Sequence, residues 1–305
     1  MTSFVEAARE LVRWRLEGFE GRMGYAPDRN EVVDGPGGAV DDLPAPLDAF
    51  FATVDEVCLP DVVDNGLFLG PPAYVRRIRE RQEPRWVERG GERVEVVVFG
   101  SGGGGGLYAL PLGAPGPVLG LPPSGIVDGT YRGRGDLVVA PDLDAFLVDV
   151  LRRLLPSLDE VVRDHVPTSP GVAGEADRIE RELGVTLPVA YRHVLEHYDL
   201  RRHLRLPFEH DVVAVNQPGV RWWGDRPRPA DQLLVANGDP FALLVDLTTG
   251  AALGLDETHT VRAADDVELL VRGLATLDAW DHRSDAVRRA IALAVGGTAD
   301  FWMHV

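Results

Sequence analysis

At 305 residues the chain is long enough for two ordinary domains, each with its own core. Its 45% apolar and 26% charged residues are typical of a soluble globular protein, and no apolar run approaches the length of a membrane span. The net charge is −17, and the chain contains Arg but no Lys. This acidity argues against nucleic acid as a partner and favours a basic protein, although it could also serve only to keep the protein soluble.

The first half of the chain combines helical and strand patterns. Apolar residues at helical spacing predict an amphipathic helix over 3–23, and a second helix is expected after Leu43-Pro44. Short strands are expected at 94–99, 107–112, 118–121 and 137–139, followed by a closing amphipathic helix at 142–155. The start of the chain is not typical of a secretory signal, and Cys58 alone permits no intrachain disulfide, so we expect a cytoplasmic protein.

A segment rich in Pro and Gly follows, and then the same order of elements recurs. Helices are expected around Ile179 and after Leu187-Pro188, strands at 233–236, 242–246 and 252–255, and a helix at 265–277. Three stretches match between the halves in the same order, which indicates a long-period duplication: 43–51 with 187–195, 118–121 with 252–255, and 140–151 with 263–274.

Residues 179–192, IERELGVTLPVAYR, resemble the opening signature of the SUKH superfamily: a helix, Leu-Gly, a short gap, then Leu-Pro and a helix containing Tyr-Arg. In physical terms Gly184 ends the first helix, Pro188 begins the second, and Tyr191 anchors that helix on the sheet. The first half resembles the same superfamily at 65–68 (NGLF), at 126–131 (IVDGTY) and in the closing helix, but its Leu43-Pro44 lacks the preceding Leu-Gly.

The resemblance implies an α+β fold of two tandem SUKH-like modules, each a central, mostly antiparallel sheet flanked by helices. We place the modules at residues 1–158 and 172–305, with a linker at 159–171. The superfamily is best known for bacterial immunity proteins that bind and neutralise polymorphic toxins, often nucleases, while some relatives act as regulatory or scaffolding proteins.

Two patterns resemble catalytic or cofactor-binding motifs, but a purely structural role explains each of them better. His193 and His197 belong to an H-x-x-E-H sequence that zinc hydrolases also use, but helical geometry places both on the face opposite the core and no third ligand is evident. The glycine run 100–105 contains G-x-G-x-x-G, yet a strand pattern continues after it, which favours a hairpin loop over a dinucleotide site. We therefore expect no enzyme, no cofactor and no metal site.

Two surfaces are candidates for partner binding. Residues 30–73 contain nine carboxylates and no Arg, and the centre of this predicted acidic patch is Asp55, Glu56, Asp61 and Asp64. Such a patch could imitate phosphate and dock on a basic enzyme cleft, or it could be an ordinary solvated face. Trp222 and Trp223 lie among prolines and glycines; because neighbours on a strand point to opposite faces, one of them could be exposed for binding, or one could cap the core.

These observations predict a non-catalytic binding protein, an immunity protein that occludes the active site of a basic toxin. The alternatives are a regulatory or scaffold protein with several partners, and a metal-dependent hydrolase built on His193 and His197.

Overall fold

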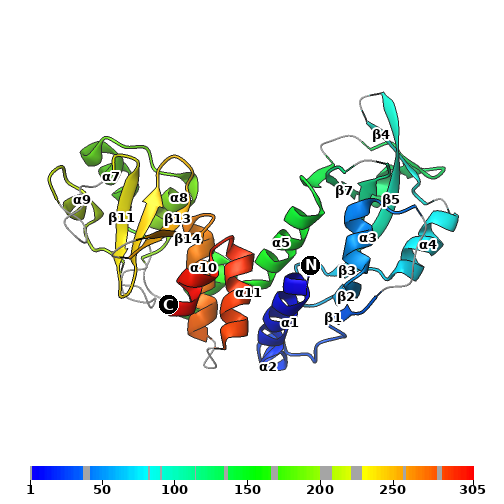
Figure 1. Ribbon diagram of the computed structural model, residues 1–305, viewed down its shortest axis with the longest axis horizontal. Helices are drawn as coiled ribbons and strands as arrows, with labels where there is room; N and C mark the ends of the chain where they lie inside the picture. The colour runs from blue at the N-terminus through cyan, green and yellow to red at the C-terminus, as the bar shows by residue number, and fades with distance from the viewer. Residues whose placement is uncertain are drawn as a thin grey trace. The chain divides into compact units, whose positions relative to one another are not determined.

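The computed structural model describes residues 2–36, 42–81, 83–89, 91–113, 115–133, 137–165, 171–199, 208–220, 229–256, 259–279 and 284–305. The chain forms two compact units, Met1–Leu154 and Leu155–Val305, which we call unit 1 and unit 2 and describe separately (Figure 1). In both units helices flank a sheet that is mostly antiparallel, with one parallel pair, β4 and β9, in unit 1, so the predicted α+β fold class is confirmed.

Unit 1 contains most of the strands. Its helices are α1 (Thr2–Leu16), α2 (Phe19–Met23), α3 (Ala45–Phe51), α4 (Pro72–Arg81), the 3-10 turn η1 (Pro123–Gly125) and α5 (Leu143–Leu154). Its strands are β1 (Glu31–Asp34), β2 (Val54–Leu59), β3 (Leu67–Leu69), β4 (Trp86–Arg89), β5 (Glu92–Gly102), β6 (Leu107–Pro111), β7 (Val118–Leu121), β8 (Ile126–Val127), β9 (Thr130–Tyr131) and β10 (Val138–Ala140).

The expected N-terminal helix is divided into two. Gly18 has a φ of 63°, a left-handed conformation that only glycine adopts without strain, and it separates α1 from α2. The predicted apolar face of α1 is buried, with Ala8 and Leu11 fully inaccessible, and it packs against α5. Arg9, also on α1, donates to the backbone oxygen of Val32 at 2.9 Å and so covers part of the edge strand β1.

Unit 2 contains a smaller sheet and more helix. Its helices are α6 (Leu158–His165), α7 (Glu175–Leu183), α8 (Val189–His197), α9 (Val212–Val215), α10 (Val267–Ala279), α11 (Asp285–Val295) and α12 (Ala299–His304). Its strands β11 (Gln232–Asn237), β12 (Ala242–Asp246), β13 (Ala252–Leu255) and β14 (Thr260–Ala264) pair in sequence order as an antiparallel meander (Figure 1).

The two units share this meander and the helix after it. In unit 1 the order β5-β6-β7-β10 is followed by α5, and in unit 2 the order β11-β12-β13-β14 is followed by α10. Gly120 pairs with Tyr108 just as Gly254 pairs with Leu243, so the match between 118–121 and 252–255 has the same strand register in both units.

The match that leads into the closing helices is shifted by one residue. Ala140 pairs with Val118 in unit 1, and its counterpart in unit 2 is Ala264, which pairs with Ala252. The carboxylates that cap the two helices are accordingly Asp142, which accepts from the Ala145 amide, and Asp266, which accepts from the Leu269 amide, both at 2.8 Å. The alignment of Asp142 with Asp265 made from the sequence is therefore wrong by one position.

The boundary between the units differs from the predicted linker. The chain divides between Leu154 and Leu155, and most of α6 lies inside the stretch 159–171 that the sequence placed between modules. Leu158 and Val161 of α6 are buried, and α6 packs against α10 within unit 2. Arg272 of α10 donates to the backbone oxygen of Pro156 at 2.7 Å, which fastens the start of unit 2 to its closing helix.

Within the described ranges, no helix has both the length and the apolar character that crossing a bilayer requires.

Candidate partner-binding surface

The predicted acidic patch lies on and after β2 in unit 1, and half of it is engaged in contacts within the fold. Asp55 and Glu56 are half-buried residues of β2. Glu56 forms an ion pair with Arg29 at 2.9 Å. Asp61 accepts hydrogen bonds from the Asn30 side-chain amide at 2.7 Å and from the backbone amide of residue 28 at 2.8 Å.

Asp64 is the most open member of the patch. Its side chain is 71% exposed, and the nearest ion-pair partner is Arg153 at 3.8 Å. The structure therefore separates the four residues into two pairs. Glu56 and Asp61 hold the segment before β1 against β2, whereas the half-buried Asp55 and the exposed Asp64 are suited to charge reversal because they do not make these contacts.

The other sequence candidates have different outcomes. Trp222 and Trp223 lie outside the described residues. The glycine run forms the expected hairpin loop between β5 and β6, closed by a hydrogen bond from the Gly102 amide to the Gly106 oxygen at 2.8 Å. His193 and His197 lie on the partly exposed side of α8 with ring centroids 4.5 Å apart, and no group of three His, Cys, Asp or Glu side chains suited to a metal occurs among the described residues.

A second acidic surface, on α7 and α8 of unit 2, was not singled out from the sequence. At its centre Arg192 contacts three carboxylates: Asp177 at 2.9 Å, Glu196 at 2.8 Å and Glu180. Glu180 also accepts from the Leu187 amide at 2.8 Å, which fixes the loop between the two helices. In the SUKH-like phrase, Tyr191 is therefore the buried ring, and Arg192 is the cation that forms ion pairs with carboxylates of both helices.

Arg178 repeats this arrangement one turn away from the loop. It forms two hydrogen bonds with Glu175 at 2.9 and 3.0 Å, an ion pair with Asp211 at 3.1 Å and a longer contact with Glu182 at 3.9 Å. The pKa of Asp211 is lowered first by its hydrogen bond from the Ala214 amide and then by Arg178, so this carboxylate stays ionised well below neutral pH.

We define the α7–α8 surface as six carboxylates and three arginines, which leaves three uncompensated negative charges on one side of a small unit. Exposed ion pairs of this kind contribute little to stability, because each side chain exchanges water for its partner at an entropic cost. Their excess negative charge is instead suited to attracting a cationic partner. The members are Glu175, Asp177, Glu180, Glu182, Glu196, Asp211, Arg178, Arg181 and Arg192.

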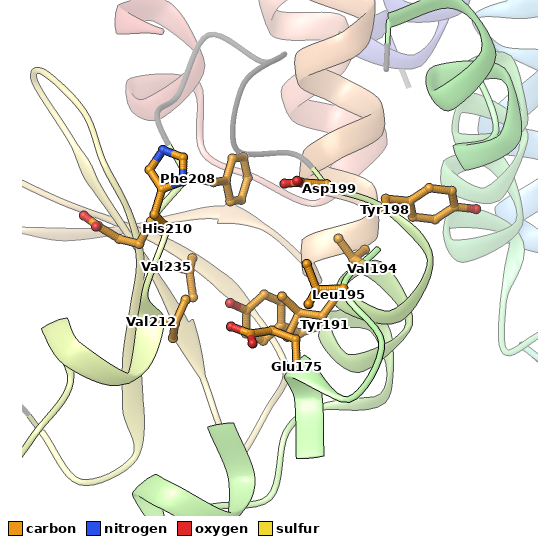
Figure 2. Close-up of a pocket in the computed structure, with 12 residues that line it drawn as sticks. Glu175, Tyr191, Val194, Leu195, Tyr198, Asp199, Phe208, His210, Val212 and Val235 are labelled. Carbon is orange, nitrogen blue, oxygen red and sulfur yellow. The ribbon is translucent and has the colours of Figure 1, made fainter. Parts of the chain in front are cut away.

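A cavity of about 40 Å³ adjoins this surface, and we call it the Tyr191 pocket (Figure 2). The buried apolar part of its wall is formed by Val194 of α8, Phe208, Val212 of α9 and Val235 of β11. The remaining lining residues are Val172, Glu175, Tyr191, Leu195, Tyr198, Asp199, Glu209 and His210.

Tyr191 is the buried polar group of the pocket. Only 2% of the residue is exposed, and its hydroxyl has no hydrogen-bond partner among the described residues. Burial, with a smaller contribution from the charge of Glu175, raises the pKa of this phenol, so the hydroxyl is neutral at physiological pH. A buried hydroxyl without a partner costs about 1–3 kcal/mol, which makes it an unusual feature to find in a core.

Acidic residues also line the pocket. Glu175, Asp199 and Glu209 all line it, and Glu175 is the one held by Arg178. Figure 2 shows the Tyr191 ring reaching across the pocket from α8 towards the Glu175 carboxylate at the start of α7. The site therefore combines apolar walls, a neutral hydroxyl and carboxylates, a set that accepts hydrogen bonds and favours positive charge.

No family model, curated protein or solved structure matches the chain.

Proposed function

We propose that this chain is a non-catalytic binding protein, and specifically an immunity protein that neutralises a basic toxin. The observation that carries the proposal is the α7–α8 surface, where each of two arginines is surrounded by three carboxylates. The resemblance of residues 179–192 to the SUKH signature supports it, because that phrase forms the α7–α8 pair itself.

The mechanism is electrostatic attraction followed by steric occlusion. A toxin that cleaves nucleic acid needs a cationic cleft for phosphate, and a carboxylate surface of excess charge competes for that cleft. Long-range attraction speeds the encounter, and the short helices then cover the cleft without any reaction of their own. Both units contribute to the attraction, because unit 1 has 24 acidic and 16 Arg residues (−8) and unit 2 has 24 and 15 (−9).

The test is affinity capture from the source lysate with three forms of the full chain. The first is the natural sequence, the second carries Asp177→Lys and Glu196→Lys on the α7–α8 surface, and the third carries Asp55→Lys and Asp64→Lys on the predicted patch of unit 1. Each double variant changes the net charge by +4, so a general effect of charge would weaken both equally.

We expect one basic protein to be captured, and we expect the α7–α8 variant to reduce its affinity by at least ten-fold while the unit 1 variant changes it much less. Loss through the unit 1 variant alone would place the partner on the predicted patch instead. Capture of several unrelated cellular proteins, insensitive to both variants, would contradict the immunity function and favour the scaffold alternative.

A further inference from the structure

The Tyr191 pocket has a composition that the α7–α8 surface alone does not explain. A surface of ion pairs attracts a basic partner without needing a cavity, whereas here a neutral, buried hydroxyl is left without a partner in the described fold. Buried polar groups in proteins are almost always hydrogen-bonded, so Tyr191 is expected to have a partner beyond the described residues, and water or a ligand can supply it.

The walls restrict what that ligand can be. Val194, Phe208 and Val212 are at most 7% exposed and offer no hydrogen bonds from their side chains, so they suit an aliphatic stem. The acceptors among the lining residues include the Tyr191 hydroxyl oxygen and the carboxylates of Glu175 and Glu209. Apolar sides with acceptors at the end are complementary to an alkyl chain that carries hydrogen-bond donors and a positive charge.

We propose that the Tyr191 pocket binds the tip of a lysine side chain presented by the basic partner. The ammonium group donates to the Tyr191 hydroxyl and to a carboxylate, while the methylene stem packs on the apolar wall. The ammonium group is a compact charge with freely rotating donors, whereas the planar fork of arginine must align with its acceptors, so we expect the pocket to favour lysine. The inference rests on the proposed function, since it supplies an anchor for the partner that the acidic surface attracts.

The test uses peptides rather than the partner, so that it can fail independently of the proposed function. The probes are three capped pentapeptides, Gly-Ser-X-Ser-Gly, in which X is lysine, arginine or norleucine. The full chain is titrated with each peptide, and binding is followed through NMR methyl signals of the pocket valines, Val194 and Val212.

We expect saturable shifts with the lysine peptide, at least five-fold weaker binding of the arginine peptide, and none with norleucine. Equal shifts with norleucine would overturn the proposal, because the pocket would then recognise only the stem. Equal or tighter binding of arginine, or no saturable shift with lysine, would also overturn it.

Two variants complete the test. Tyr191→Phe keeps the ring and removes the hydroxyl, and it should weaken binding of the lysine peptide about ten-fold, since a hydrogen bond to a charged group is lost. Tyr131→Phe is the matched control, an equally buried tyrosine of unit 1 at 2% exposure, and it should leave the affinity unchanged. An unchanged affinity in Tyr191→Phe would overturn the proposal even if the lysate yields a basic partner. Lysine-selective peptide binding that depends on the Tyr191 hydroxyl would support the proposal even if the lysate yields no basic partner.

Discussion

Replacing Tyr191 by Phe should leave unit 2 as stable as before, or make it more stable, which is the opposite of the usual effect of altering a fully buried residue. The substitution keeps the ring that packs beneath α8 and removes only the hydroxyl oxygen. In the described fold that oxygen makes no hydrogen bond, so no described residue loses a partner when it is removed.

The magnitude follows from the cost of the buried hydroxyl. Leaving it unpaired costs about 1–3 kcal/mol, and a water molecule, for which a cavity of about 40 Å³ has room, offsets part of this cost. We therefore expect the free energy of unfolding to rise by between zero and about 1 kcal/mol. A rise of 1 kcal/mol would increase the melting temperature of a unit of this size by about 2–4 °C.

The assay is urea unfolding of the full chain followed by circular dichroism, with the natural sequence and Tyr131→Phe measured in parallel. A loss of more than about 1 kcal/mol in Tyr191→Phe would show that the hydroxyl holds the fold together through a hydrogen bond. Such a result would refute both the unpaired hydroxyl and the pocket built on it.

Two further predictions concern the polar contacts that support unit 2. Asn216→Ala should destabilise unit 2 by about 3 kcal/mol in the same urea assay, because the fully buried amide bonds to Val212 O and Leu234 O, both at 2.8 Å, and to Leu234 N at 2.9 Å; a change below 1 kcal/mol would contradict this. Asp246→Asn should cost about 1 kcal/mol at pH 7 and much less at pH 3. The pKa of Asp246 is lowered chiefly by the hydrogen bond from the Thr249 amide. The carboxylate therefore contributes fully to the stability of the fold above its pKa in the unfolded chain, and this contribution is lost as pH falls through the lower pKa of the folded state. An equal stability difference at both pH values would contradict this origin.

Most of the meander strands, and the helices that follow the two meanders, could be predicted from sequence because each has a strong local pattern. Strands β11, β12 and β13 are continuous apolar runs bounded by turn residues, and their expected limits agree with the structure to within a residue or two. Strand β14 was missed because its alternating stretch, Thr260–Ala264, is short and contains a single large apolar residue, Val261. Helix α6 was missed because prolines on both sides made Leu158–His165 resemble a linker, although its apolar stripe packs on α10.

The candidate site was less predictable because its charges come together only in three dimensions. Asp177 and Arg192 are 15 residues apart, and Asp211 reaches Arg178 across 33 residues, so the clusters of three carboxylates cannot be read from spacing. Along the chain, Glu180 and its neighbours have the alternating charges of an ordinary exposed helix. The one signal in the sequence was the Tyr-Arg pair at 191–192 of the SUKH-like phrase. Finding the surface from it would have required knowing that Arg192 lies beside α7, where it pairs with Glu180.

The most direct test of the account is the salt dependence of the affinity between the full chain and its captured partner, measured by titration calorimetry from 50 to 500 mM NaCl. We predict that affinity falls steeply with salt for the natural chain, because attraction between exposed charges is screened within about 10 Å at 0.1 M salt. For the Asp177→Lys, Glu196→Lys variant we predict a clearly shallower dependence. An affinity that is independent of salt, or a variant with the same slope as the natural chain, would contradict the claim that the α7–α8 surface binds a basic protein.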